Sequence, residues 1–491
     1  MNPDARPSHV KCDRLFALLI CGLTTFAIAR LEVNAASVFT EKDTAAIQRY
    51  LKKEFGAGNK AIVVGLLDEN GTQIFAEGKL DNGTDGPVNG DTIFEIGSIT
   101  KVFTSLLALD SDRRGEISLQ KPVSAYLPAK IRVPEFKGTP IAIAHLAGQD
   151  SGLPWNPDNV VDRPFEDMPL KELKRACDAY TKDALYASIS RYALTNQPGT
   201  QFQYSNVGMA LLGLALERRI GQTYESLVVE RICRPLGMND TLITLSDKQR
   251  KRLASGHYAN GERAENINFK VMAPAGSLLS TVNDLLKLIA ANLDYRETNL
   301  KPLLKRAQEI RHTGSKQFGR TRMPWQDQGV YQEPGSDLMG HGGGGFGYLA
   351  FVGFDRAKRR GVAILSGQMN LNPAGIGWAI LQNMPLTRDN IVRLVREIVG
   401  LGVALRTDEE TGLLQIRSVY PRSPAGVAGL RAEQFIHTID GESTRGKTIA
   451  QCLNLLRGEE GQPIRIEVGR ADGGDKREIK ITRGKFITTS E

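Results

Sequence analysis

The chain has 491 residues, of which 41% are hydrophobic and 24% are charged, a composition typical of globular proteins with large apolar cores. The net charge is +8, but lysine and arginine are scattered, and their two densest runs, residues 248–252 and 356–360, lie in polar stretches. Scattered charge of this kind favours solvated turns over a nucleic-acid-binding surface, so we expect no nucleic-acid partner.

The N-terminal segment has the layout of a secretory signal peptide. Lys11 and Arg14 precede an apolar run at residues 15–29, and Val33-Asn34-Ala35 then offers a small-residue cleavage site. We therefore expect residues 1–35 to be a signal peptide and the mature protein to be exported, to the periplasm or the cell exterior. The apolar run is short for a membrane span, which needs about 20 residues, so an uncleaved anchor is the alternative.

The cysteines and histidines favour neither disulfides nor a metal. Cys12 and Cys21 lie in the expected signal peptide, which leaves three widely spaced cysteines: Cys177, Cys233 and Cys452. An odd number at such spacing does not predict a disulfide framework. No C-x-x-C motif is present, and the six histidines do not cluster with acidic residues at ligand spacing. We therefore expect no metal and no cofactor.

Residues 36–386 read as one mixed α/β domain. A hairpin is predicted from residues 61–67 and 73–75 around Asn70-Gly71, and two more strands from residues 348–354 and 361–366. Between these pairs the pattern is mostly helical, with examples at residues 102–109, 207–218 and 282–293, and a closing helix at 375–384. Strands at both ends with helices between predict one antiparallel sheet flanked by helices, plus a helical lobe.

The first candidate catalytic element is Ser98-Ile99-Thr100-Lys101, which matches S-x-x-K, the nucleophile motif of β-lactamases and penicillin-binding proteins. Residues three apart share one helix face, so the lysine can accept the hydroxyl proton if burial keeps it neutral. Ser8 and Ser118 begin copies of the same motif. Only Ser98 follows a strand-like segment and opens an apolar helix, so we expect it to be the nucleophile.

The second element is Tyr204-Ser205-Asn206, which follows a Pro-Gly turn and precedes a strongly apolar helix. A tyrosine beside two cations can ionise below its usual pKa and act as a general base. Asn206 can donate to a substrate carbonyl and contact the lysine. Tyr258-Ala259-Asn260 has the same spacing but lies in a polar loop, so Tyr204 is preferred.

The third element is His341-Gly342-Gly343-Gly344, placed immediately before a predicted strand. Glycines there let a substrate lie against a strand edge, with Gly343 and Gly344 contacting it. The backbone N–H of Gly344 could form an oxyanion hole with that of Ser98. We expect His341 to stand where a cation faces the substrate carboxylate or the tyrosine. His312-Thr313-Gly314 is the competitor, in surroundings that predict a polar loop.

With these elements in order, the chain resembles the class C serine β-lactamases and the related penicillin-recognising peptidases and esterases, over roughly residues 45–385. Further segments carry the resemblance: residues 94–101, 141–146, 151–154, 198–206, 235–238, 275–281 and 341–343. The family is often threonine-rich before Ser151-Gly152, where this chain has Ala147-Gly148-Gln149-Asp150. His341 stands where true β-lactamases usually carry lysine.

The resemblance implies a β-lactamase/transpeptidase-like fold with Ser98 as the acylated residue. It also implies that Lys101 and Tyr204 are the proton-transfer pair and that Asn206 contacts substrate. We expect a serine hydrolase that acts on an amide or ester bond, in a D-amino-acid peptide, a β-lactam or an ester. The histidine at position 341 weakens the case for β-lactam hydrolysis more than the case for acyl transfer. The rival hypothesis is an inactive penicillin-binding-like protein that binds cell-wall peptides and protein partners.

A second unit is expected at residues 398–486, after a linker at 387–397. Gly400-Leu401-Gly402-Val403, followed by residues 423–430 and 436–441, resembles a bacterial PDZ domain. Such domains accept an extended peptide as an added strand, and the glycine loop holds a terminal carboxylate. The resemblance therefore implies a protein C-terminus or extended peptide as partner at residues 400–403. The alternative is a glycine-rich β-domain that only packs on the enzyme.

Overall fold

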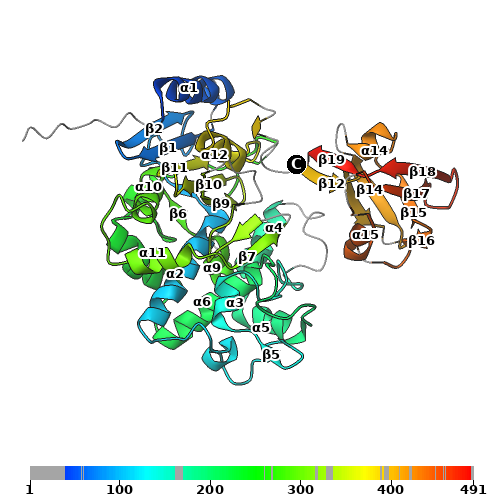
Figure 1. Ribbon diagram of the computed structural model, residues 1–491, viewed down its shortest axis with the longest axis horizontal. Coiled ribbons are helices and arrows are strands. Elements are labelled where there is room, and N and C mark those ends of the chain that lie inside the picture. Colours follow the sequence, from blue (N-terminus) through cyan, green and yellow to red (C-terminus); the bar gives the residue numbers. More distant parts are fainter. Residues whose placement is uncertain are drawn as a thin grey trace, which may run out of the picture. The chain divides into compact units, whose positions relative to one another are not determined.

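The computed structural model describes residues 39–487, apart from positions 57, 59, 161–169, 259, 267–268, 316–318, 328–334, 388–389, 392–396, 409, 420–422, 448, 457 and 459–460 (Figure 1). The expected signal peptide therefore lies outside the described residues, as does much of the expected linker. Within the described part of the chain, no helix combines the length and apolarity that crossing a membrane requires.

The first body is built on a five-stranded antiparallel sheet with the strand order β2-β1-β11-β10-β9. Its strands are β1 (Ile62–Asp68), β2 (Gly71–Glu77), β9 (Leu338–Gly344), β10 (Leu349–Asp355) and β11 (Arg360–Ser366). The N-terminal hairpin thus pairs directly with the two strands from the far end of the domain. This confirms the predicted sheet, including the hairpin around position 70 and the strands on either side of the turn at 356–359.

Alternation along β1 explains how the sheet buries both faces. Val63 and Leu67 join the core shared with the helical lobe, whereas Ile62, Val64 and Leu66 join a second core on the opposite face. Successive side chains of a strand point to opposite faces of the sheet, so this alternation is expected where both faces are covered by other elements. The helices that pack on the sheet are α1 (Glu41–Phe55), α10 (Val282–Asn292) and α12 (Pro373–Leu381).

α2 (Thr100–Arg113) is buried from Thr100 to Ser111, and α3 (Ile143–Ala147), α6 (Asn206–Ile220), α7 (Tyr224–Val228), α9 (Ala273–Gly276) and α11 (Lys301–Ala307) pack against it to form a helical lobe (Figure 1). Further helices are α4 (Leu170–Ala179), α5 (Lys182–Arg191) and α8 (Asp247–Arg250). Smaller strand pairs are β3 (Phe94–Glu95) with β6 (Leu279–Ser280), β4 (Glu135–Phe136) with β5 (Thr139–Pro140), and β7 (His312–Ser315) with β8 (Gly319–Thr321). The predicted helical lobe is confirmed.

Two segments form strands that the sequence pattern does not predict. Residues 341–344 precede the predicted strand β10, but they are not a loop: they form the end of another strand, β9, at the edge of the main sheet. His312 does not lie in a loop but begins β7. In both cases the segment is rich in glycine and polar residues, which disfavour strands locally, and it is extended because a neighbouring strand pairs with it.

The C-terminal body has its own apolar core, which includes Leu401, Ile436, Cys452 and Ile464. Its strands are β12 (Glu397–Gly400), β13 (Val403–Thr407), β14 (Leu414–Val419), β15 (Phe435–Ile439), β16 (Glu442–Ser443), β17 (Pro463–Gly469), β18 (Arg477–Thr482) and β19 (Gly484–Ile487), with helices α14 (Pro424–Val427) and α15 (Ile449–Leu456). The predicted β-rich unit with one longer helix is confirmed. The apolar core of the first body includes the buried side chain of Ile391, which lies five residues past the expected end of that domain at residue 386.

Candidate active site

Ser98 lies in a tight turn between a strand and the buried helix. β3 leads into the single-turn 3₁₀ helix η1 (Gly97–Ile99), and α2 begins at Thr100. Gly97 has a φ of +48°, a backbone conformation that favours glycine. The turn places Ser98 at the N-terminal end of α2, where the helix dipole favours developing negative charge.

Lys101 is the buried partner of Ser98. Its Nζ lies 2.9 Å from Ser98 Oγ and donates to the carbonyl oxygen of Ala275 at 2.6 Å. The side chain is fully buried, and this desolvation lowers the pKa of Lys101 well below its usual value. Burial therefore disfavours the charged lysine, and a neutral amine at this distance can accept the serine proton.

Tyr204 packs against the same pair. Lys101 Nζ lies 4.8 Å from the centre of the Tyr204 ring, and a hydrogen bond links the tyrosine with Ser98. Burial raises the pKa of Tyr204 above its usual value, and the hydrogen bond with Ser98 only partly opposes this shift. The direction of this shift is opposite to the one that two neighbouring cations would cause, because burial favours the neutral phenol and also disfavours the charged form of Lys101.

His341 lies beside Tyr204, with the two ring centres 6.3 Å apart. Its Nδ1 is 2.7 Å from the carbonyl oxygen of Gly342, and its side chain is almost fully buried. Burial, together with the nearby Lys101, lowers the pKa of His341 to about 4. The histidine is therefore neutral at pH 7, and the expectation of a cation at this position is wrong for the free site.

Asn206 is the first residue of α6, whose N-cap is Ser205. Its side-chain amide donates to Asn156 Oδ1 at 2.7 Å, and its backbone N–H donates to the carbonyl of Trp155 at 2.8 Å. Among the hydrogen bonds of the described residues, none joins Asn206 to Lys101. Asn206 remains close to the site because it lies only two residues after Tyr204.

The glycines of β9 allow the edge strand to approach the nucleophile turn. A Cβ at Gly343 would lie 2.1 Å from the carbonyl oxygen of Ile96, and one at Gly97 would lie 2.4 Å from the carbonyl oxygen of Gly344. Only glycine fits at these positions without a shift of the backbone. The sequence expectation of a close backbone approach at Gly343 and Gly344 thus has a concrete steric basis.

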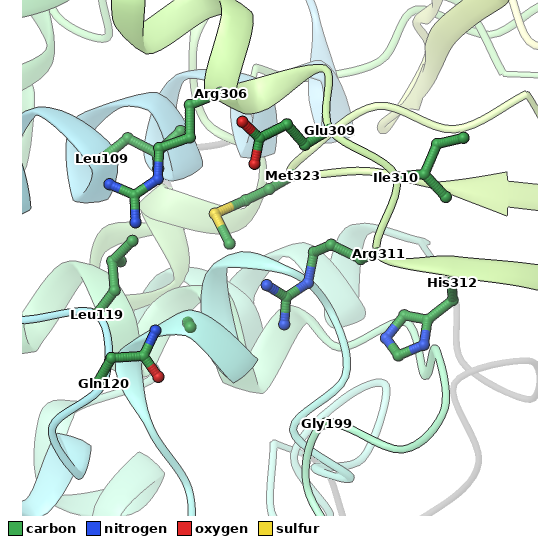
Figure 2. Close-up of a pocket in the computed structure, with 11 residues that line it drawn as sticks. Leu109, Leu119, Gln120, Gly199, Arg306, Glu309, Ile310, Arg311, His312 and Met323 are labelled. Atoms are coloured by element: carbon green, nitrogen blue, oxygen red, sulfur yellow. The ribbon is translucent and has the colours of Figure 1, made fainter.

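The competing motif at His312 lies in different surroundings. Its Nε2 is 2.7 Å from Asp150 Oδ2, and Arg311 makes an ion pair with the same carboxylate, also at 2.7 Å. Figure 2 shows Arg311 and His312 projecting toward the loop that carries Gly199, where they line a cavity of about 370 Å³. The contact of His312 with Asp150 gives this histidine a structural role, and no catalytic role is needed to explain its position.

The other duplicate motifs also occur in structural settings. Ser118 lies outside the helices, and its backbone N–H donates to Tyr126 Oη. Tyr258 lies in a turn, where its N–H donates to the carbonyl of Glu262. Ser8 lies outside the described residues. The described part of the chain also contains no group of three or more His, Cys, Asp or Glu side chains arranged to hold a metal.

Three residues near the site were not predicted. Ala275 supplies the carbonyl that accepts from Lys101, and Trp155 lies with its ring centre 4.8 Å from that of Tyr204 while remaining 51% exposed. Gln149 hydrogen-bonds to the backbone N–H groups of Gln203 and Ser205, the residues that flank Tyr204. A carbonyl has no sequence signal, and Trp155 and Gln149 lie about 50 residues before Tyr204, so only the fold brings them together.

An antiparallel sheet flanked by helices, with a half-buried serine and a buried lysine at the start of the central helix, defines the β-lactamase/transpeptidase-like class of serine hydrolases. The chain belongs to the β-lactamase family: the model of that family matches residues 49–382. A model described as a PDZ domain matches residues 415–470. The recognition of both units from sequence motifs is confirmed, as is the fold class.

Among relatives, the chain is similar to the D-alanyl-D-alanine-carboxypeptidase/endopeptidase AmpH of Escherichia coli. The two are 28% identical over 416 residues, which cover 80% of this chain and 98% of AmpH. A β-lactamase of Providencia stuartii is 26% identical over 306 residues, covering 61% of this chain and 70% of that protein.

Solved structures show the same fold. A β-lactamase/D-alanine carboxypeptidase from Yersinia pestis aligns with a TM-score of 0.54 at 23% identity, covering 72% of this chain and 98% of that one. A class C β-lactamase from Rhodobacter sphaeroides aligns with a TM-score of 0.56 at 20% identity, covering 69% and 97%.

Proposed function

We propose that this protein is an active serine hydrolase that cleaves an amide or ester bond in a D-amino-acid peptide or related compound, through an acyl-Ser98 intermediate. The observation that carries the proposal is the 2.9 Å contact between Ser98 Oγ and Lys101 Nζ, in a site where burial disfavours the charged lysine. A nucleophile within hydrogen-bond reach of a neutral base is the arrangement that acyl transfer requires.

In the acylation step, Ser98 Oγ attacks the substrate carbonyl carbon while its proton passes to the Lys101 amine. The backbone N–H groups of Ser98 and Gly344 hold the oxyanion of the tetrahedral intermediate. The bond to the leaving group then breaks, and the proton reaches the departing nitrogen or oxygen by way of the Tyr204 hydroxyl. A water molecule releases the acyl group by the reverse sequence of proton transfers, which restores the Ser98 hydroxyl.

Asn206 and His341 have substrate-binding roles in this proposal. The Asn206 amide can donate to a substrate carbonyl from the start of α6, and its bond to Asn156 keeps it oriented. His341 is neutral in the free site, so it acts as a hydrogen-bonding group and not as a permanent positive charge. True β-lactamases usually carry lysine at this position, which is why we place peptides and esters ahead of β-lactams as substrates that turn over.

The test is covalent labelling with a fluorescent penicillin and a fluorophosphonate, followed by peptide mapping. Wild-type protein should carry the label on the peptide containing Ser98, and Ser98→Ala should not be labelled. Cleavage of a D-alanyl-D-alanine peptide and of a small ester is then measured on the same two proteins. An unlabelled wild type that still binds cell-wall peptides would support the rival, an inactive binding protein.

For the C-terminal unit we propose peptide binding at residues 400–403. The supporting observation is that β13, which follows this loop, lies at the edge of its sheet, and α15 packs beside it. Leu401 is buried, and Gly402 has a φ of +78° in the turn that leads into Val403. An exposed strand edge beside a helix can accept an added strand. Isothermal titration with a library of free C-terminal peptides tests this, with Gly402→Val as the loop-blocked control.

Export is proposed from the sequence alone, on the three-part layout of residues 1–35. Expression of the full chain in a bacterium, followed by fractionation and N-terminal sequencing, gives the answer. A mature N-terminus at Ala36 in the periplasmic or extracellular fraction would support cleavage. An intact chain in the membrane fraction would support the uncleaved anchor.

A further inference from the structure

Gln149 occupies an unusual position next to the catalytic tyrosine. It follows α3 and Gly148, has a left-handed φ of +59°, and is only 5% exposed. Left-handed backbone is uncommon for a residue other than glycine, asparagine or aspartate, so the surrounding contacts must hold it there. The segment Ala147-Gly148-Gln149-Asp150 is also where the sequence departs from the threonine-rich pattern of the family.

The side chain of Gln149 hydrogen-bonds to both backbone polar groups of Ser205. Its Oε1 accepts from the Ser205 N–H at 2.5 Å, and its Nε2 donates to the Ser205 carbonyl at 3.4 Å. Its backbone carbonyl accepts from the Gln203 N–H at 2.7 Å. Gln149 therefore hydrogen-bonds to the backbone of residues 203 and 205, which flank Tyr204, and so restrains the backbone on both sides of the tyrosine.

The segment that contains Gln149 is itself held in place by the contacts of the next residue, Asp150. The backbone carbonyl of Asp150 accepts from the Gly199 N–H at 2.8 Å, which ties the same segment to the start of the Tyr204 loop. The Asp150 side chain is fully buried and is held by Arg311 and His312. Charge-assisted bonds of this kind are stronger than neutral ones, so the support under Gln149 is stiff.

We propose that Gln149 is a positioning residue of the acyl-transfer reaction: its amide fixes the Ser205 peptide and thereby holds the Tyr204 hydroxyl against Ser98. The proposal rests on the function proposed above. An amide is suited to this task because it presents an acceptor and a donor side by side, matching the N–H and the carbonyl of Ser205. A displacement of about 1 Å in a catalytic group can lower a rate about 100-fold.

The test is a double-mutant cycle on the full chain. Gln149→Met keeps the side-chain length and removes both hydrogen bonds, and it is measured alone and in the Tyr204→Phe background. The acylation rate by a fluorescent penicillin should fall about 10- to 100-fold in the wild-type background. With Tyr204 already replaced by phenylalanine, the same change should cost less than about threefold, because there is no hydroxyl left to position.

Gln308→Met is the matched control, because Gln308 is also a buried glutamine whose amide bonds to Asn292, in a different part of the fold. It should change the acylation rate less than about threefold in both backgrounds, even if it lowers the melting temperature as much as Gln149→Met does. If Gln149→Met fails to fold, Gln149→Glu takes its place, since it keeps the acceptor but not the donor.

A second readout does not depend on activity. In protein labelled with ¹³C at tyrosine Cζ, the Tyr204 resonance, assigned with Tyr204→Phe, should move in Gln149→Met and stay in place in Gln308→Met. An unmoved resonance, or equal rate losses in both backgrounds, would overturn the positioning role. A wild type that is never acylated, but whose Tyr204 resonance moves in Gln149→Met, would instead overturn the proposed acyl transfer and leave the structural role of Gln149 intact.

Discussion

Gly343 and Ile96 are in direct backbone contact: a Cβ at position 343 would lie 2.1 Å from the Ile96 carbonyl oxygen. Ile96 hydrogen-bonds through its N–H to Leu278 and through its carbonyl to the N–H of Ile99, so it cannot move without disturbing the turn that carries Ser98. Because Gly343 has no side chain, the edge strand β9 can pack directly against the turn that carries Ser98. This backbone contact fixes the position of the strand relative to the turn.

Replacing Gly343 with alanine should both destabilise the protein and impair acylation. Overpacking of this kind typically costs 1–3 kcal/mol, so we expect an unfolding free energy lower by about 2 kcal/mol. Acylation should fall at least about tenfold, because Ser98 and the Gly344 N–H move apart. Gly345→Ala is the control, since a Cβ there meets its nearest atom, Glu95 Oε2, at 3.5 Å. Equal effects of the two substitutions would contradict the steric explanation.

The buried His341 should make stability depend on pH. Its pKa in the folded protein is about 4, below the usual 6.5, so between these values the unfolded chain binds a proton that the folded chain does not. Stability should thus fall as the pH drops from about 6.5 to about 4, by about 3 kcal/mol in the limit. His341→Gln should lose this part of the slope. Denaturant titrations of both proteins at pH 4 to 7 measure the difference, and parallel slopes would contradict the assignment.

Lys101 and Tyr204 should act as one proton-transfer unit. Lys101→Ala and Tyr204→Phe should each lower the acylation rate about 10²- to 10⁴-fold, and the double variant should be little worse than the poorer single one. Stopped-flow labelling of the three variants with a fluorescent penicillin gives the rates. Losses that multiply in the double variant would mean that the two groups work independently.

The acylation rate should also follow the protonation of Lys101. Only the neutral amine can accept the Ser98 proton, and burial lowers the pKa of Lys101 well below its usual value. The rate should therefore rise as the pH increases through this lowered pKa and reach its plateau well below pH 10. A rate that continues to rise up to the usual lysine pKa would show that Lys101 is charged in the working enzyme.

Much of the fold and the core of the site follow from local sequence. Ser98 and Lys101 lie three residues apart at the start of one helix, so their contact is set by helix geometry alone. Strands β1, β10 and β11 were identifiable because buried strands are continuous apolar runs bounded by turn residues, whereas the glycine-rich edge strand β9 was missed. Tyr204 and His341 come from distant segments, and only their local contexts distinguished them from Tyr258 and His312.

The charges of the site could not be read from sequence, because they depend on burial. From the sequence, Lys101 and His341 suggest positive charges and Tyr204 suggests a phenolate beside them. In the folded protein, desolvation favours the neutral form of all three side chains. The hydrogen bonds between Gln149 and Ser205 could not be predicted from the sequence either. Ser205 lies 56 residues away from Gln149, and a glutamine after a helix has no distinctive pattern.

The last prediction concerns the division of labour between the two bodies. All the proposed catalytic groups precede residue 345, and the C-terminal body has a separate apolar core. Ile391 still belongs to the first body: its side chain is buried there, and its carbonyl accepts from Asn372 Nδ2 at 3.1 Å. A truncation that preserves the enzyme should therefore end at residue 396, directly before β12, and not at the expected domain end of 386.

The chain ending at residue 396 should hydrolyse a small ester at a rate within about threefold of the full protein, because no catalytic group has been removed. Cleavage of a large cell-wall substrate should fall further if the PDZ domain raises the local concentration of a partner. The chain ending at residue 386 is the matched comparison and should melt at a lower temperature, because it loses the contacts of Ile391. Loss of small-ester turnover in a folded 396-residue protein would show that the C-terminal body completes the active site.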